Sequence, residues 1–501
     1  MFSTGVPKPI TKAFNDDRRK GTASDEICLS FPGETVGEKL RPKCTMRFFD
    51  LVSFYLVTGI SLRWIASAAS AGSSSVIIWF AAWLTFYTPL ALSVIELSSR
   101  YPQQGGLYVW SKRAFGEFGA FICAWIYWTS NLPYFPAVLY FAAGNIIYMR
   151  GGHWDSLESS PMFYIGFSLV TLGLITLMNI LGVDVSKWLH NTGALAMGLP
   201  VLIIIVMGLL AWHRFGAASS FHFAALLPGL HLKEIIFWSS LTFALGGCET
   251  ASFMGEEIRN PRRAIPWALF IAGLLVTLCY VGGTACILLA LHPSQVNDLQ
   301  GLMQAIAATA GKIGLFWIIP IAAALIALSN VGAASAYLAA TARLPFVAGI
   351  DRFLPPAFGK LHPRWRTPYV ALAVQGICGA IFTFLGQSGT TVRGAYDVLV
   401  SLGIITYFLP YLFLFIAMFR LQREPGGPDV IRVPGGKPVA RLLAVVGFTT
   451  CLITIAVSLL PSPEEGNPTL AMIKIVGGTL VLVAVGAIVY WWGKRKRSGT
   501  T

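Results

Sequence analysis

The sequence predicts an all-α polytopic membrane protein with about twelve transmembrane helices, and three observations support this fold class. Of the 501 residues, 55% are hydrophobic and 12% are charged, which is too little polar surface to cover a soluble protein of this size. The apolar residues are collected in runs long enough to cross a bilayer. Lysine and arginine are abundant in alternate connections between these runs and sparse in the others, as expected of a chain threaded through a membrane.

The apolar runs are expected to form the helices in order along the chain. They lie at residues 47–71, 75–99, 116–149, 160–182, 186–212, 233–257, 266–291, 312–342, 367–386, 395–420, 438–460 and 469–492. The first 45 residues are polar and contain no apolar core, so they do not form a signal peptide. We therefore expect a cytosolic tail at 1–45, a transmembrane domain at 46–492 and a basic cytosolic tail at 493–501.

The basic residues predict the sidedness of the chain. Of the 37 lysines and arginines, 30 fall in the connections and tails on one side, 6 fall on the other side, and Arg63 lies inside a run. Because lysine and arginine are enriched in cytoplasmic loops, both termini are expected in the cytoplasm of a multi-pass protein of the cell membrane. The even number of runs agrees with this orientation.

Two of the runs are interrupted in the middle. The first breaks at Thr58–Ser61 and is followed by Arg63, and the sixth breaks at Ala244–Gly247 and is followed by Glu249. In lipid, non-helical backbone persists only where it lines a cavity or is covered by protein. Breaks in the first and sixth helices fit a five-plus-five inverted repeat followed by two further helices, and such breaks indicate a central site. The alternative is that these glycines only allow close helix packing.

Two segments resemble a known family. TFALGGCETASFMGEEIRNPRRAIP at 242–266 and ELSSRYPQQGGLYVWSKRAFG at 96–116 are similar to the amino acid, polyamine and organocation transporter superfamily, and the resemblance covers roughly residues 46–492. It implies an amino acid permease that moves its substrate by alternating access, as a proton symporter or an exchanger. The partners it implies are an amino acid, a coupling proton or counter-substrate, and the lipid bilayer, with no nucleic acid.

The resemblance also implies where the substrate binds. The first break would hold a carboxylate and the carbonyls of the second break would hold an amine. The first break reads TGISLR here, where many members have a Gly-Ser-Gly-like sequence. The expected substrate-binding residues are Thr58, Gly59, Ile60, Ser61, Arg63, Trp128, Asn131, Ala244, Leu245, Gly246, Gly247 and Glu249.

Several polar residues have two interpretations. Arg63 either clamps the substrate carboxylate, or has a structural role as part of an ion pair or exposed to water in the outer vestibule. Glu249 either receives the substrate amine or the coupling proton, or joins the two half-helices by hydrogen bonds. Glu96 is a candidate for proton coupling or gating. For Glu96, Glu256 and Glu257, solvated helix ends are the favoured interpretation, and gate ion pairs with nearby arginines are the alternative. Tyr134 and Tyr407 are further candidates for lining the cavity.

Other functions are less consistent with the sequence. An intramembrane enzyme would need ligands or nucleophiles at bilayer depth, but all seven histidines fall in loops or at the ends of runs. The eight cysteines are isolated, so neither a metal site nor a cofactor is expected. A channel or a membrane-embedded nutrient receptor remains an alternative of another class. A polyamine transporter is the alternative within the superfamily, although Arg63 favours a substrate that carries a carboxylate.

Overall fold

The protein is built from helices that match the predicted runs. The structure is a computed structural model and describes residues 42–153, 155–229, 231–296, 301–387, 392–425, 427, 430–458 and 468–498. The long helices are α1 (Phe48–Gly59), α2 (Leu62–Ser70), α3 (Ser75–Ala82), α4 (Thr88–Arg100), α5 (Leu107–Ser130), α6 (Tyr134–Ile146), α7 (Pro161–Leu181), α8 (Val183–Phe215), α10 (Leu232–Ala244), α11 (Pro261–Ala290), α13 (Ile318–Thr341), α15 (Tyr369–Gln387), α16 (Val392–Leu421), α17 (Gly436–Ser458) and α18 (Pro468–Ser498).

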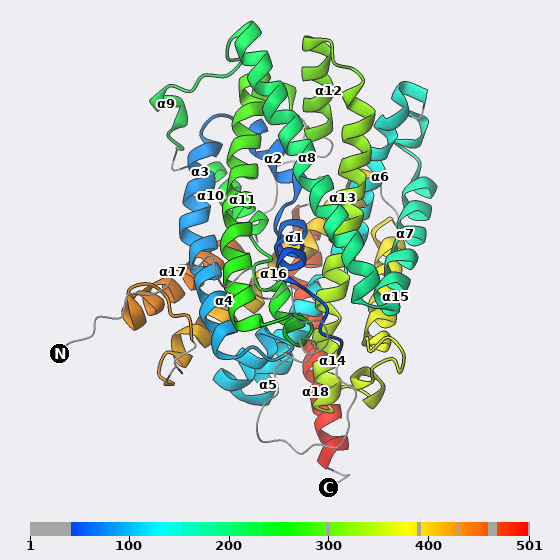
Figure 1. Cartoon of the computed structure of the whole chain (residues 1–501), viewed down its shortest axis with the longest axis vertical. Coiled ribbons are helices and arrows are strands. Elements are labelled where there is room, and N and C mark those ends of the chain that lie inside the picture. The colour runs from blue at the N-terminus through cyan, green and yellow to red at the C-terminus, as the bar shows by residue number, and fades with distance from the viewer. Residues whose placement is uncertain are drawn as a thin grey trace, which may run out of the picture.

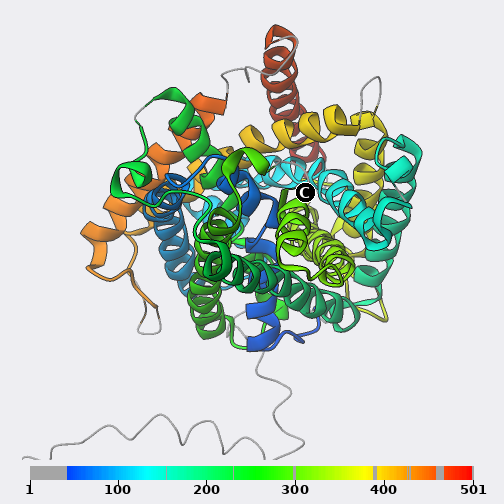
Figure 2. The same ribbon diagram turned by 90° about the horizontal axis from the view of Figure 1, so that it is seen from above.

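Shorter helices occupy the connections. They are α9 (Phe223–Leu226), α12 (Gly301–Ile313) and α14 (Arg343–Ile350), and the 3-10 helix η6 (Thr250–Glu257) follows α10. In Figure 1, α9 and α12 lie at one end of the molecule, while α14 and the end of α18 lie at the other. The expected outer and cytoplasmic connections are thus separated in space. From above, the helices form a bundle with α17 and α18 at its periphery (Figure 2).

The fold class predicted from the sequence is confirmed. Within the described residues, seven helical segments are long and apolar enough to cross a membrane, and the bent pair α1 and α2 makes an eighth. Shorter apolar helices lie in three of the remaining runs, at 234–244, 369–384 and 406–421. The last helix, α18, continues to Ser498, past the predicted end of the transmembrane domain at residue 492.

Helix α11 carries apolar residues on both of its faces, as expected of a helix in lipid. On α11, Trp267, Phe270, Leu274 and Leu278 are exposed along one stripe, while Ile265, Leu269 and Val276 on the opposite face are buried in the protein. A water-soluble helix would carry charges on the exposed stripe. The exposed face of α11 is therefore suited to contact acyl chains, and its buried face packs on α1 and α2.

Candidate functional site

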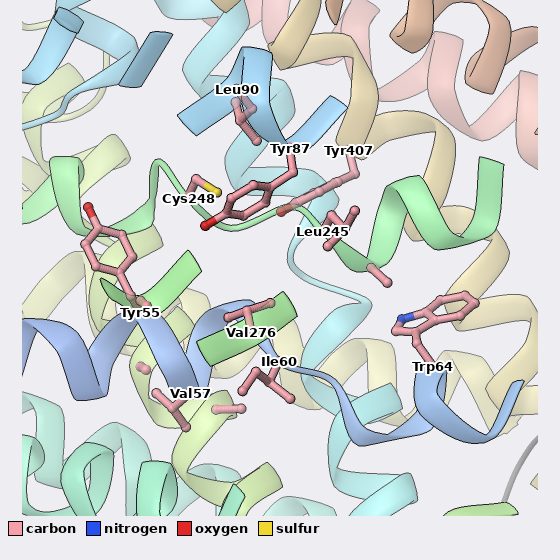
Figure 3. Close-up of a cluster of buried hydrophobic side chains, with 14 of the residues drawn as sticks. Tyr55, Val57, Ile60, Trp64, Tyr87, Leu90, Leu245, Cys248, Val276 and Tyr407 are labelled. Carbon is pink, nitrogen blue, oxygen red and sulfur yellow. The ribbon is translucent and has the colours of Figure 1, made fainter. Parts of the chain in front are cut away.

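The two predicted breaks lie at the centre of the molecule. Helix α1 ends at Gly59, Ile60 and Ser61 are extended (φ −108° and −124°), and α2 starts at Leu62, bent by 40° from α1. Helix α10 ends at Ala244, and the chain then turns through Gly247 at φ +102° before η6 begins. Figure 3 labels Leu245 and Cys248 on this non-helical stretch, with the Tyr407 side chain beside it, and Ile60 in the break of the first helix. The expected interruptions are thus present in the backbone.

A cavity of about 110 Å³ lies against both breaks. Its walls come from α1 and α2, α5 and α6, α10, α13 and α16. The lining residues are Thr58, Gly59, Ile60, Ser61, Arg63, Trp64, Ser130, Asn131, Tyr134, Ala137, Val138, Phe141, Phe243, Ala244, Gly246, Asn330, Tyr337, Gly403 and Tyr407. Helix α2, which runs from the first break and packs on α12, contributes Arg63 and Trp64 to this lining. The cavity therefore extends towards the end of the molecule that carries α12.

Eight of the twelve residues expected at the site line this cavity. They are Thr58, Gly59, Ile60, Ser61, Arg63, Asn131, Ala244 and Gly246. Tyr134 and Tyr407 also line it, as the sequence suggested. The structure therefore brings the two breaks and the middle of α5–α6 together around one space.

Four expected residues lie elsewhere. Trp128 faces α15, where its indole N–H donates to Gln375 Oε1 at 3.1 Å, because the rotation of α5 turns it away from the cavity. Leu245, within the second break, and Glu249, just after it, are buried and do not line the cavity. Gly247, the last residue of the break, does not line it either, and its N–H donates to the hydroxyl of Tyr411 at 3.3 Å.

Sequence reasoning missed several lining residues. They are Trp64, Ser130, Ala137, Val138, Phe141, Phe243, Asn330, Tyr337 and Gly403. Some carried a usable signal, because 134, 137, 138 and 141 follow the spacing of one face of a helix. Phe243, Asn330 and Gly403 had no such signal, since only the packing of α10, α13 and α16 decides which of their faces meets the cavity.

The hydroxyl of Tyr280 on α11 joins the two breaks. It accepts a hydrogen bond from the backbone N–H of Ser61 at 2.9 Å, and it lies 3.2 Å from the carbonyl oxygen of Gly59 and 3.0 Å from that of Ala244. A hydroxyl has one proton, so it donates to one of these two carbonyls at a time. The Tyr280 ring is stacked on Trp79, with centroids 4.3 Å apart. Tyr280 does not line the cavity, so it holds the breaks from behind.

A second tyrosine holds the first break from the side of α13. The hydroxyl of Tyr337 donates to the carbonyl oxygen of Thr58 at 2.9 Å. The hydroxyl of Thr58 lies 3.2 Å from that of Thr250 at the start of η6, which is another contact between the two interrupted segments. The unwound backbone is thus partnered by side chains, as groups buried at bilayer depth must be.

Glu249 is completely buried among tyrosines. Its Oε1 accepts hydrogen bonds from the hydroxyls of Tyr127 and Tyr411, the latter at 2.9 Å. Its Oε2 is buried without a hydrogen-bond partner among the described residues. The carboxyl group therefore connects η6 to α5 and α16, and one of its oxygens is still able to carry a proton.

Two acidic residues near the α14 end of the molecule are paired with arginine. Glu96 contacts Arg100 at 2.7 Å and accepts further hydrogen bonds from Gln422 and the N–H of Val433. Glu257 forms a two-point ion pair with Arg343, at 2.8 and 2.9 Å. The side chains of Glu257 and Arg343 are 3% and 1% exposed, and that of Glu96 is 2% exposed. The favoured expectation of solvated ends was therefore wrong for Glu96 and Glu257, which form ion pairs with arginine. Packing of α13 against η6 removes the Glu257 pair from solvent.

The arrangement can hold a small solute with two opposite charges. The N-terminal end of α2 and the Arg63 guanidinium favour an anion, while the carbonyl ends of α1 and α10 favour a cation. The lining between them is largely aromatic and aliphatic. Among the described residues that line the cavity there is no aspartate or glutamate.

Comparisons with known proteins agree on one class. A family profile described as Amino acid permease matches residues 47–485. A probable agmatine/putrescine antiporter of Lactococcus lactis is 22% identical over 85% of this chain and 90% of its own length. A serine/threonine exchanger of Bacillus subtilis is 24% identical over 82% of this chain and 86% of its own. The crystal structure of MhsT in complex with L-phenylalanine has a similar fold, with a TM-score of 0.58, 15% identity and coverage of 83% of this chain and 100% of that one.

Proposed function

The chain belongs to the amino acid permease family, and from this we propose that it is a secondary transporter that exchanges amino acids across the cell membrane by alternating access. The observation that carries this proposal is the cavity at the junction of the two broken helices. A rigid protein with such a cavity would only bind its solute. Two half-helices that meet at unwound backbone can instead change their angle and open the cavity to either side in turn.

We place the substrate as a zwitterion between the breaks. Its carboxylate lies at the N-terminal end of α2 with Arg63, and its ammonium group lies at the carbonyl ends near Thr58 and Ala244. Arg63 lies on the cavity wall with its guanidinium carbon 5.0 Å from the centroid of the Trp64 ring. The planar guanidinium is thereby oriented, which suits two-point binding of a carboxylate.

A polyamine substrate is the second candidate, because one relative is named as a probable agmatine/putrescine antiporter. A diamine carries positive charges at both ends and no carboxylate. In this cavity it would meet Arg63 and no acidic side chain among the described lining residues. The lack of a counter-charge argues for amino acids over polyamines.

Glu249 is our candidate for the group that couples transport to protons. Its buried Oε2 could take up a proton, and its link to Gly247 through Tyr411 would transmit the change to the second break. Glu96 is farther away and its oxygens already contact Arg100, Gln422 and Val433, so we propose a gating role for it. The charge distribution further supports termini that both face the cytoplasm.

The test is counterflow in proteoliposomes that contain the purified protein. Uptake of a labelled amino acid should be saturable, should be accelerated by unlabelled amino acid inside, and should be inhibited by neutral or acidic amino acids more than by putrescine. Unsaturable flux would indicate a channel, and stronger inhibition by putrescine would favour the polyamine alternative. A pH-sensitive dye inside the vesicles separates proton symport from exchange, and any proton signal should be lost in Glu249→Gln.

Tyr280→Phe should weaken substrate binding without stopping transport. The substitution leaves the Ser61 N–H without its partner and releases the link between Gly59 and Ala244. A buried donor left unpaired costs on the order of 1 to 3 kcal/mol, so KM should rise by roughly tenfold while kcat changes by less than about twofold. Initial rates of exchange at several substrate concentrations measure both constants.

Thr277→Val is the matched control for this variant. Thr277 lies about one turn earlier on α11 and donates a hydrogen bond to the carbonyl of Gly273 at 2.8 Å, within its own helix, and it does not line the cavity. Its KM should stay within about twofold of the wild type, because the geometry of the breaks is unchanged. An unchanged KM in Tyr280→Phe would show that Tyr280 only packs.

A further inference from the structure

A Ser-Asn pair occurs twice at the cavity, once in each half of the chain. Ser130 and Asn131 end α5, and Ser329 and Asn330 lie within α13. Both asparagines line the cavity. Helix α5 belongs to the third predicted run and α13 to the eighth, so the two pairs occupy corresponding helices of the five-plus-five repeat.

The two pairs make the same hydrogen bonds. Each serine hydroxyl donates to the carbonyl three residues earlier, at 2.8 Å in both cases. Each asparagine Nδ2 donates to the carbonyl four residues earlier, at 2.7 Å in both cases. Each Nδ2 also lies near the preceding serine hydroxyl, at 3.4 and 3.5 Å. The local sequence alone is sufficient for this geometry, since all acceptors are within four residues.

These bonds fix which atom of each amide faces the cavity. Donation by Nδ2 to a helix carbonyl determines the amide orientation, so Oδ1 points away from that carbonyl. In the described part of the chain Oδ1 of Asn131 and Asn330 has no hydrogen-bond donor, and neither atom is among the fully buried ones. The residues themselves are only 2% and 4% exposed. Each helix therefore presents one carbonyl-type acceptor to the cavity.

We propose that Asn131 and Asn330 select amino acid substrates whose side chain carries a hydrogen-bond donor, namely a hydroxyl or a carboxamide. This inference rests on the proposed function and names the substrate class of the same site. The carboxylate and ammonium group of any amino acid are held at the breaks. The side chain then extends towards α5 and α13, where it meets the two Oδ1 atoms.

An apolar side chain of the same shape binds more weakly because it displaces water from the Oδ1 atoms and donates no hydrogen bond in its place. Displacing water from an amide oxygen without replacing its hydrogen bond costs free energy, and a site built for a donor therefore discriminates against the analogue that lacks it. Threonine and valine form the sharpest pair, since they differ by a hydroxyl in place of a methyl group. The apolar walls at Ile60, Val138 and Phe141 accept the methyl group that both have in common.

The experiment measures inhibition of counterflow by threonine, valine, serine and alanine in proteoliposomes. For the wild-type protein, the inhibitory concentration of threonine should be about tenfold or more below that of valine. The inhibitory concentration of serine should likewise be about tenfold or more below that of alanine. In the double variant Asn131→Leu with Asn330→Leu, the inhibitory concentration of valine divided by that of threonine should fall to within about threefold of one. At least one of the two single variants should lower this ratio, because one hydroxyl donates to one acceptor at a time. The fall should come from weaker binding of threonine, with valine little changed.

Asn145→Leu is the matched control. Asn145 lies on α6 and donates from Nδ2 to the carbonyl of Phe141 at 2.7 Å, the same local bond, but it does not line the cavity. This variant should keep the wild-type ratio.

Three outcomes would overturn the inference. The first is equal inhibition by threonine and valine in the wild type. The second is an equal loss of inhibition by threonine and by valine in the asparagine variants. The third is a lower ratio of the valine to the threonine inhibitory concentration in Asn145→Leu. The ratio of the valine to the threonine inhibitory concentration in the wild type tests the proposed selectivity even where a variant fails to accumulate. Counterflow with no amino acid at all would instead reject the proposed function, so the two failures are distinguishable.

Discussion

Gly247→Ala is expected to reduce transport by about a hundredfold or more while the protein still inserts into the membrane. Gly247 has φ +102°, a conformation that costs an L-residue roughly 1 to 3 kcal/mol. A Cβ atom there would lie 2.9 Å from the carbonyl oxygen of Thr58 and 2.8 Å from the hydroxyl of Tyr337. Those two atoms form the hydrogen bond that holds the first break, so the alanine would push the breaks apart.

The measurement is the initial rate of amino acid exchange per amount of folded protein, with size-exclusion chromatography in detergent to establish folding. Gly198→Ala on α8 is the control, because a Cβ atom at Gly198 meets no atom within 4 Å and its backbone is helical. Its rate should equal that of the wild type. Wild-type exchange by Gly247→Ala would mean that the second break does not need its left-handed turn.

Arg343→Met should produce the largest loss of stability. Arg343 donates from Nε and Nη2 to the two oxygens of Glu257, and also contacts the carbonyl of Ala339. Removing one partner of a pair that is almost fully buried leaves a carboxylate without a counter-charge. The free energy of unfolding should fall by about 3 to 5 kcal/mol. Thermal unfolding of the purified protein in detergent measures this change.

The double variant Arg343→Met with Glu257→Gln should recover much of this loss, because no unpaired charge remains. Lys187→Met tests an exposed pair, since Lys187 and Asp184 are 3.1 Å apart with side chains 23% and 53% exposed. It should change stability by less than about 1 kcal/mol. A double variant as unstable as Arg343→Met alone would contradict the role assigned to the ion pair.

The ion pair also has a position suited to a gate. The backbone carbonyl of Glu257 accepts hydrogen bonds from the N–H groups of Thr45 and Met46, both at 3.0 Å. The segment before α1, the end of η6 and the start of α14 therefore meet at one point. Opening of the cavity towards this end of the molecule would have to separate them. The ion pair thus stabilises the arrangement in which the cavity extends towards α12.

Local sequence determined the elements of this protein. Each of the twelve apolar runs contains one helix or several consecutive helices, because lipid partitioning depends on the composition of a single segment. The breaks at Thr58–Ser61 and Ala244–Gly247 were also predictable. Glycine next to a charge within an apolar run is costly in an unbroken lipid-facing helix, so it indicates backbone that lines a site.

Tertiary structure alone decided how those elements meet. The sequence around Trp128 does not predict its contact with Gln375. The sequence around Glu249 does not predict its hydrogen bonds with Tyr127 and Tyr411. Tyr280 lies 219 positions from Ser61 in the chain, yet its hydroxyl joins both breaks. A run of apolar residues specifies a helix whatever its rotation about its own axis. The rotation is set by side chains on other helices, and it determines which residues face the cavity.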